Sequence, residues 1–175
     1  YPERGNKSLR LQDKDPHDYA RAIRVFPESK KARVTFKVQA GQTDTGQLEI
    51  EVMDRYGNRP VRIQFLEDGR IKALDGSTIV DVASYEPNNW REFGLTVDVT
   101  AGTYSLSIDG NSMLDRAQFA ETVLSVERLS FRTGAHRTVP TRRMNPEPGP
   151  GDIPGADEPS KLAVYHIDDV TAARN

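Results

Sequence analysis

Apolar and polar residues alternate one by one along much of this chain. For example, Val34, Phe36 and Val38 alternate with Thr35 and Lys37. Successive side chains of a β-strand point to opposite faces, so this pattern predicts strands with one face on a core and one face in water. Five segments show it: 34–38, 48–52, 61–65, 93–99 and 104–108.

Turn residues separate these segments at short intervals. Asp75-Gly76 and Asp109-Gly110 are pairs of the kind that supply the positive φ values of tight hairpins. Many short strands joined by such turns are typical of a sandwich or a barrel. We therefore predict an all-β fold in which two antiparallel sheets pack as a jelly-roll-like sandwich.

Two segments lack the alternation. The segment 115–123 fits either a short helical turn or a plain loop. The segment 134–160 carries six prolines and several glycines, and proline cannot donate to a strand ladder, so we predict a long surface loop there. A last strand is expected at 163–171. Residues 1–175 are predicted to form a single domain, because two-sheet sandwiches commonly reach this length as one unit.

Composition excludes several classes of function. The formal net charge is −2, which gives no broad positive field for nucleic acid. No apolar run approaches the roughly 20 residues that span a bilayer. The chain has no cysteine, so neither disulfides nor thiolate metal sites can form. The first residue is Tyr1 rather than Met, and we interpret the chain as a piece of a longer, secreted or periplasmic protein.

Two further stretches carry a family resemblance. Trp90 opens an alternating segment, and the next segment ends in the Asp109-Gly110 turn. This arrangement resembles the concanavalin A-like lectin and glucanase superfamily, including laminin-G-like domains. The closing segment, Tyr165-His166-Ile167-Asp168-Asp169-Val170, resembles the terminal strand of jelly-roll carbohydrate-binding modules. The whole chain is similar to jelly-roll domains appended to bacterial polysaccharide-degrading enzymes.

The resemblance implies a structural calcium ion between the first and last strands. Calcium prefers six to eight oxygen ligands, which carboxylates supply. The candidate ligands are Asp13, Asp15, Asp168 and Asp169. The alternative is that Asp15 caps a turn before Pro16 and that the other carboxylates are solvated or hydrogen-bonded.

The acidic residues Glu49, Glu51 and Asp54 are similar to the catalytic motif of laminarinase-type glycosidases in this superfamily. Glu51 stands where that motif has its central aspartate, and Asp54 stands where it has its second glutamate. Glu49 and Glu51 should share one strand face, as an acid and a nucleophile must. The alternative is a charged strand face that Arg62 and Arg33 balance from neighbouring strands.

Sugar recognition would need aromatic ring faces and planar hydrogen-bonding groups. Tyr85 and Trp90 are the aromatic candidates. Arginine forks bind carboxylate or sulfate groups through two bonds, so an anionic glycan is the predicted ligand. The other candidate ligand-binding residues are Arg62, Arg70, Arg132, His136 and Arg142. Alternatively, the arginines only fasten the long loop by pairing with Glu127, Asp152, Asp157 and Glu158.

Three hypotheses about function follow. The first is a non-catalytic carbohydrate-binding or accessory domain that binds a polysaccharide or an oligosaccharide. The second is a structural domain that packs on a catalytic domain of the same parent chain and binds no sugar. The third is a glycoside hydrolase that uses Glu49, Glu51 and Asp54.

Overall fold

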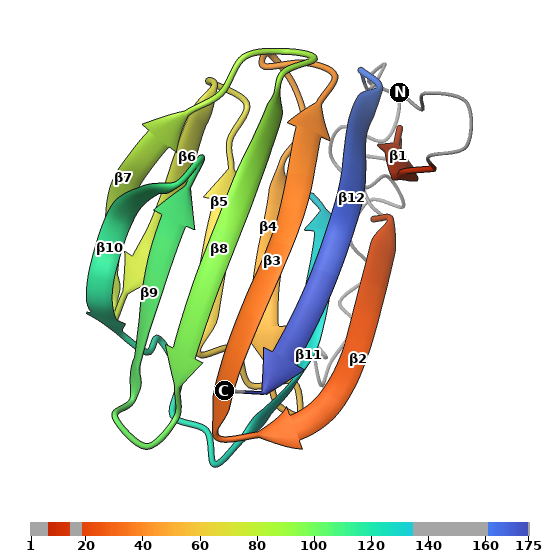
Figure 1. The fold of residues 1–175 in the computed structure, drawn as a ribbon. Helices are drawn as coiled ribbons and strands as arrows, with labels where there is room; N and C mark the ends of the chain where they lie inside the picture. The colour runs from red at the N-terminus through yellow and green to blue at the C-terminus, as the bar shows by residue number, and fades with distance from the viewer. Residues whose placement is uncertain (1–6, 15–18, 135–160, 175) are drawn as a thin grey trace, which may run out of the picture.

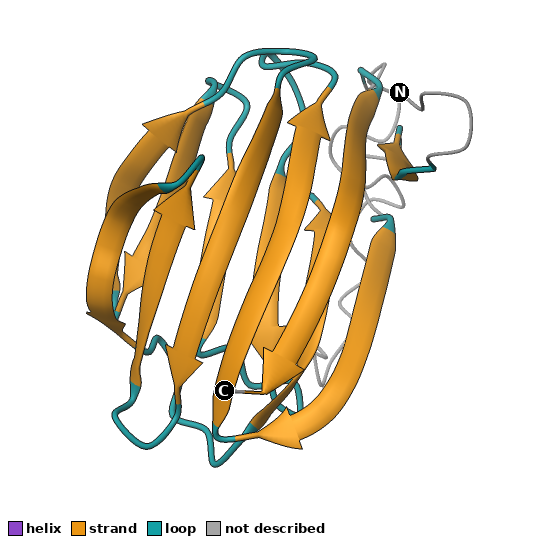
Figure 2. Cartoon of the chain, viewed as in Figure 1, coloured by secondary structure: helices purple, strands orange, loops and turns teal. Residues whose placement is uncertain are grey.

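The computed structural model describes residues 7–14, 19–134 and 161–174. This part of the chain contains twelve strands and no helix (Figure 2). It also contains no helix that is long and apolar enough to cross a membrane. The strands are β1 (Leu9–Asp13), β2 (Arg21–Ser29), β3 (Lys31–Ala40), β4 (Leu48–Met53), β5 (Val61–Phe65), β6 (Arg70–Asp75), β7 (Thr78–Ser84), β8 (Trp90–Asp98), β9 (Thr103–Ile108), β10 (Asn111–Gln118), β11 (Val126–Thr133) and β12 (Ala163–Arg174).

The strands form two antiparallel sheets of six strands each, packed face to face (Figure 1). Sheet A has the order β1-β12-β3-β8-β9-β10, and sheet B has the order β2-β11-β4-β5-β6-β7. The chain crosses between the sheets several times, and β4 to β7 run as consecutive neighbours within sheet B. The predicted all-β, jelly-roll sandwich is therefore confirmed.

Alternation explains the core between the sheets. The apolar residues of the five predicted segments are buried there, apart from Val99, which is partly buried. The Phe36 ring of sheet A stacks on Phe93 with a centroid distance of 5.1 Å, and it meets Phe131 of sheet B edge-on at 5.2 Å. Aromatic pairs of this geometry add to the stabilisation that burial provides. These contacts join the two sheets at their centre.

The terminal strands lie side by side, as the resemblance implied. β1 pairs with β12 in antiparallel register, with Leu11 opposite Tyr165. β12 also pairs with β3 on its other side, and it extends three residues beyond the predicted end, to Arg174. Because three segments distant in sequence meet here, the closing strand holds the N-terminal region on the sheet.

The segment 115–123 is not a helix. Asn111–Gln118 forms strand β10, whose register with β9 shifts twice. Arg116 adopts a positive φ of 54°, and the irregularity returns Ala117 to the core opposite Tyr104. These shifts disrupt the period of two that would have revealed the strand. The predicted loop at 134–160 lies, apart from Gly134, outside the described residues.

Candidate functional site

Polar side chains on the outer face of sheet B form a row that crosses five strands. Arg132 of β11 lies opposite Glu49 of β4, which lies opposite Gln64 of β5. Gln64 also lies opposite Lys72 of β6, and Lys72 lies opposite Asp81 of β7. Neighbouring strands are about 4.8 Å apart, so these five residues, the polar row, span roughly 19 Å.

Glu49 organises the centre of the polar row. Its Oε1 accepts a hydrogen bond from Gln64 Nε2 at 2.7 Å, and Arg62 Nη2 lies 3.3 Å from both of its carboxylate oxygens. Arg132 Nη2 approaches Oε2 at 4.0 Å. Glu49 is buried, and a buried carboxylate requires such partners to remain charged. Glu49 therefore orients Arg62 and Gln64 from beneath.

Glu51, which lies two residues farther along β4, has a similar environment. Arg59 Nη1 donates to its Oε1 at 3.4 Å, and Arg21 Nη2 lies 4.0 Å from its Oε2. Arg21 also donates through Nε to Ser130 Oγ at 3.0 Å. Glu49 and Glu51 share one face, as predicted, and Arg62 is one of the balancing cations. Arg33 is not, because it lies on β3 of sheet A.

Asp54 directly follows β4 and holds the turn. Its Oδ1 accepts from the amides of Tyr56 at 2.8 Å and Asn58 at 2.9 Å, and its Oδ2 accepts from Asn58 Nδ2 at 2.7 Å. Burial alone would raise the pKa of Asp54, but the hydrogen bonds from Asn58, Tyr56 and Gly57 outweigh it and hold the pKa below its usual value. This environment suits a turn cap rather than a catalytic acid.

Two cations meet one carboxylate at the open edge of sheet B. Lys72 Nζ lies 3.6 Å from Asp81 Oδ1, and Arg70 Nη1 lies 3.7 Å from Asp81 Oδ2. Arg70 has a second and closer partner, because its Nε donates to Asp68 Oδ2 at 2.7 Å. The Lys72 ammonium group therefore lies just beyond hydrogen-bonding distance of Asp81.

The structure brings together only part of the predicted ligand-binding set. Arg62, Arg70 and Arg132 lie on the outer face of sheet B. Tyr85 is buried, its ring packs on Phe65 at 4.9 Å, and its hydroxyl donates to the Leu66 carbonyl at 2.5 Å. Burial raises the pKa of Tyr85 to about 12 and leaves no free ring face for a sugar, so we omit it from the site.

Trp90 begins β8 in sheet A, opposite Gln39 and away from the polar row. His136 and Arg142 lie outside the described residues. Sequence reasoning missed Arg21, Arg59 and Asp81 as members of this face. The alternation of Arg128, Ser130 and Arg132 with buried neighbours could have identified β11 as a contributor, but no sequence pattern pairs it with β4.

The predicted calcium ligands are spread along β12. Asp13 lies opposite Ala163, whereas Asp168 is five residues farther along the strand, or roughly 17 Å away. Asp13 accepts a hydrogen bond from Thr133 Oγ1 at 2.7 Å, and Asp169 pairs with Lys37 at 2.7 Å. Asp15 lies outside the described residues. Within the described ranges no three acidic or histidine side chains form a metal-binding group, and these positions do not fit one shared ion. The described residues therefore give the predicted calcium ion no support, and chelation tests it.

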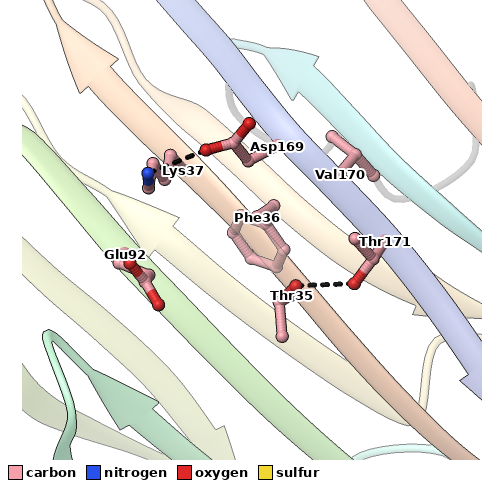
Figure 3. Close-up of a pocket in the computed structure, with 7 residues that line it drawn as sticks. All are labelled: Thr35, Phe36, Lys37, Glu92, Asp169, Val170 and Thr171. Atoms are coloured by element: carbon pink, nitrogen blue, oxygen red, sulfur yellow. Dashed lines mark hydrogen bonds and ion pairs between the residues drawn. The ribbon is translucent and has the colours of Figure 1, made fainter.

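The outer face of sheet A has a shallow depression of about 380 Å³ beside a bulge in β12. Figure 3 shows its two polar contacts, the Lys37–Asp169 ion pair and a hydrogen bond of 2.6 Å between the hydroxyls of Thr35 and Thr171. Two carboxylates, those of Glu92 and Asp169, and a single lysine line it. This balance is unfavourable for an anionic ligand, so sheet B remains the candidate face.

Comparison with known proteins identifies the family. A family model described as "Sialidase-like, CBM domain", where CBM denotes a carbohydrate-binding module, matches residues 2–147. A solved structure titled "Sialidase" superimposes with a TM-score of 0.88 and 33% identity over 96% of this chain. This chain covers only 15% of that sialidase chain. No curated protein matches the sequence.

More distant structures share the fold alone. The alginate lyase AlgAT5 aligns with a TM-score of 0.51 and 13% identity over 98% of this chain and 72% of its own. The Caenorhabditis elegans galectin LEC-6 aligns with a TM-score of 0.50 and 11% identity, covering 91% of this chain and 95% of that one. The predicted resemblance to concanavalin A-like jelly-roll domains is confirmed, and the chain belongs to the sialidase-like carbohydrate-binding module family.

Proposed function

We propose that the outer face of sheet B binds the acidic sugar of a glycan, with Lys72 and Arg62 as its main contacts. Sialic acid is the sugar we favour, because the structure with 33% identity is titled a sialidase. The observation that carries the proposal is the polar row, in which Gln64 lies opposite Lys72 and next to the oriented Arg62.

The charges of this face favour a carboxylate. The Arg62 side chain is 18% exposed, and Glu49 fixes the position of its guanidinium. Lys72 offers three donors, and its ion-pair partner Asp81 lies at 3.6 Å. A sugar carboxylate between these cations would accept charge-assisted hydrogen bonds, which are stronger than hydrogen bonds between neutral groups. Gln64 would serve the neighbouring sugar hydroxyls.

We further propose that the domain is a non-catalytic part of a longer secreted or periplasmic sialidase-type enzyme. This chain covers only 15% of the matched sialidase chain, and this small share supports an accessory role. The hydrolase hypothesis gains no support, because the carboxylates of Glu49 and Glu51 are buried and ion-paired and Asp54 caps a turn. A catalytic domain in the same chain would supply the chemistry, and this domain would hold the enzyme at its substrate.

The test is calorimetric titration with 3′-sialyllactose and with lactose. We expect K72Q to weaken binding of sialyllactose roughly tenfold, the loss expected for a charged hydrogen bond. K37Q, which removes a lysine from the opposite sheet, should bind like the wild type. Equal affinity for lactose and sialyllactose, or no effect of K72Q, would refute the acidic-sugar proposal. A folded protein that binds neither probe, nor any glycan on an array, would leave only the structural-domain hypothesis.

A further inference from the structure

We infer that Asp81 is a built-in competitor for the acidic group of the glycan and that it sets the selectivity of the site. The inference rests on the proposed function of sheet B. The Asp81 carboxylate faces Lys72 and Arg70 at 3.6 and 3.7 Å. A ligand carboxylate on the polar row would approach the same ammonium group.

The position of Asp81 makes this contact easy to exchange. Its side chain is 59% exposed on β7, the edge strand of sheet B. Both of its ion pairs exceed normal hydrogen-bonding distance, and exposed pairs of this kind contribute little to stability. In the described part of the chain no hydrogen bond involving the Asp81 carboxylate is found. A bound anion can therefore displace it without breaking the fold.

The other carboxylates near the site differ in this respect. Asp68 accepts bonds from both the backbone amide of Arg70, at 3.1 Å, and its guanidinium Nε, at 2.7 Å. It therefore holds the β5–β6 turn together with Arg70. Glu49 is buried under Arg62 and Gln64. Neutralising Asp81 therefore removes one negative charge from this face, while Asp68 still holds Arg70 and Glu49 still holds Arg62.

The expected effect follows from repulsion between like charges. An anion bound at Lys72 would lie on the order of 5 Å from Asp81, and two like charges at that distance in water repel enough to change affinity roughly fourfold. D81N removes the charge and keeps the shape of the side chain. It should therefore strengthen binding of an acidic glycan and leave binding of a neutral one unchanged.

The experiment titrates wild type, D81N and D169N with 3′-sialyllactose and lactose at low ionic strength. D169N is the matched control, because Asp169 is 56% exposed, pairs with a lysine and lies on sheet A. Its φ of 51° is one that asparagine also tolerates. We expect D81N to bind sialyllactose about fourfold more tightly than the wild type. The gain should be smaller in 0.5 M salt, because salt screens the repulsion between the two negative charges. D169N should show no gain.

The outcomes separate this inference from the function on which it rests. If wild type binds sialyllactose and D81N binds it equally or less tightly, Asp81 is not a competitor, although the site stands. If D81N loses affinity for both probes, Asp81 accepts bonds from sugar hydroxyls instead. If no folded variant binds sialyllactose, both proposals are overturned. Melting curves of all three proteins confirm that they are folded.

Discussion

The pair of Glu49 and Arg62 offers the sharpest test of the structure beneath the site. We consider E49Q, R62M and the double variant, because both replacements keep the approximate size of the side chain. Glu49 is 2% exposed, and Arg62 Nη2 lies 3.3 Å from each of its carboxylate oxygens. R62M leaves a buried carboxylate with Gln64 and the more distant Arg132. E49Q leaves Arg62 without its anion.

The magnitude follows from these distances. The Coulomb attraction at 3.3 Å is about 5 kcal/mol at an effective dielectric constant of 20. Desolvation of the buried carboxylate cancels much of this attraction. We therefore expect R62M alone to lower the free energy of unfolding by about 3 kcal/mol, and the coupling energy of the pair to be about 2 kcal/mol.

Urea denaturation followed by the fluorescence of Trp90, the single tryptophan, measures these free energies. The four proteins complete a double-mutant cycle, and equal m-values would show that the unfolded states are comparable. A parallel cycle at Asp44 and Lys161, which are both exposed, should give additive effects. Additivity within about 0.5 kcal/mol for Glu49 and Arg62 would refute their coupling and the claim that Glu49 orients the arginine.

Two further predictions concern metal and pH. Because the register separates Asp13 from Asp168, we expect excess EDTA to leave the melting temperature unchanged. An ion bound at 100 times its Kd would add about 2.7 kcal/mol, so a fall of several degrees would show that calcium does bind. The hydrogen bonds to Asp54 keep its folded pKa below its usual value, so its stabilisation is complete above the unfolded pKa of about 3.9 and is lost as the pH falls through the folded value. D54N should therefore cost about 1–2 kcal/mol at pH 7 and much less near pH 2, and an equal loss at both pH values would contradict this assignment.

Much of the fold could be predicted because alternation reports directly on which face of a strand is buried. The segments containing Phe36, Ile50, Ile63, Leu95 and Leu106 were all recognised in this way, and all are core strands. β10 was missed because its register shifts break the period. β2 was also missed, because Pro27 lies within it and Ile23 and Val25 face outward, which an edge strand permits.

The candidate site was predictable only in fragments. Arg62, Gln64, Arg70 and Lys72 share a polar face by local alternation, so the sequence identifies them as a group. Asp81 and Arg132 join them through pairing between strands, and Arg132 is separated from Glu49 by more than eighty residues. Tyr85 has the residue type that sugars stack on, but only the packed structure shows that its ring is buried.

The sequence by itself determined the class of fold, because a period of two residues is a local property that dictates which side chains face a core. It also determined that charged and amide groups would lie on the outside of the sheets. Tertiary structure alone decided which of those groups meet, because strand order and register join positions that are distant along the chain. The polar row exists only after the two sheets have closed and β11 has paired with β4.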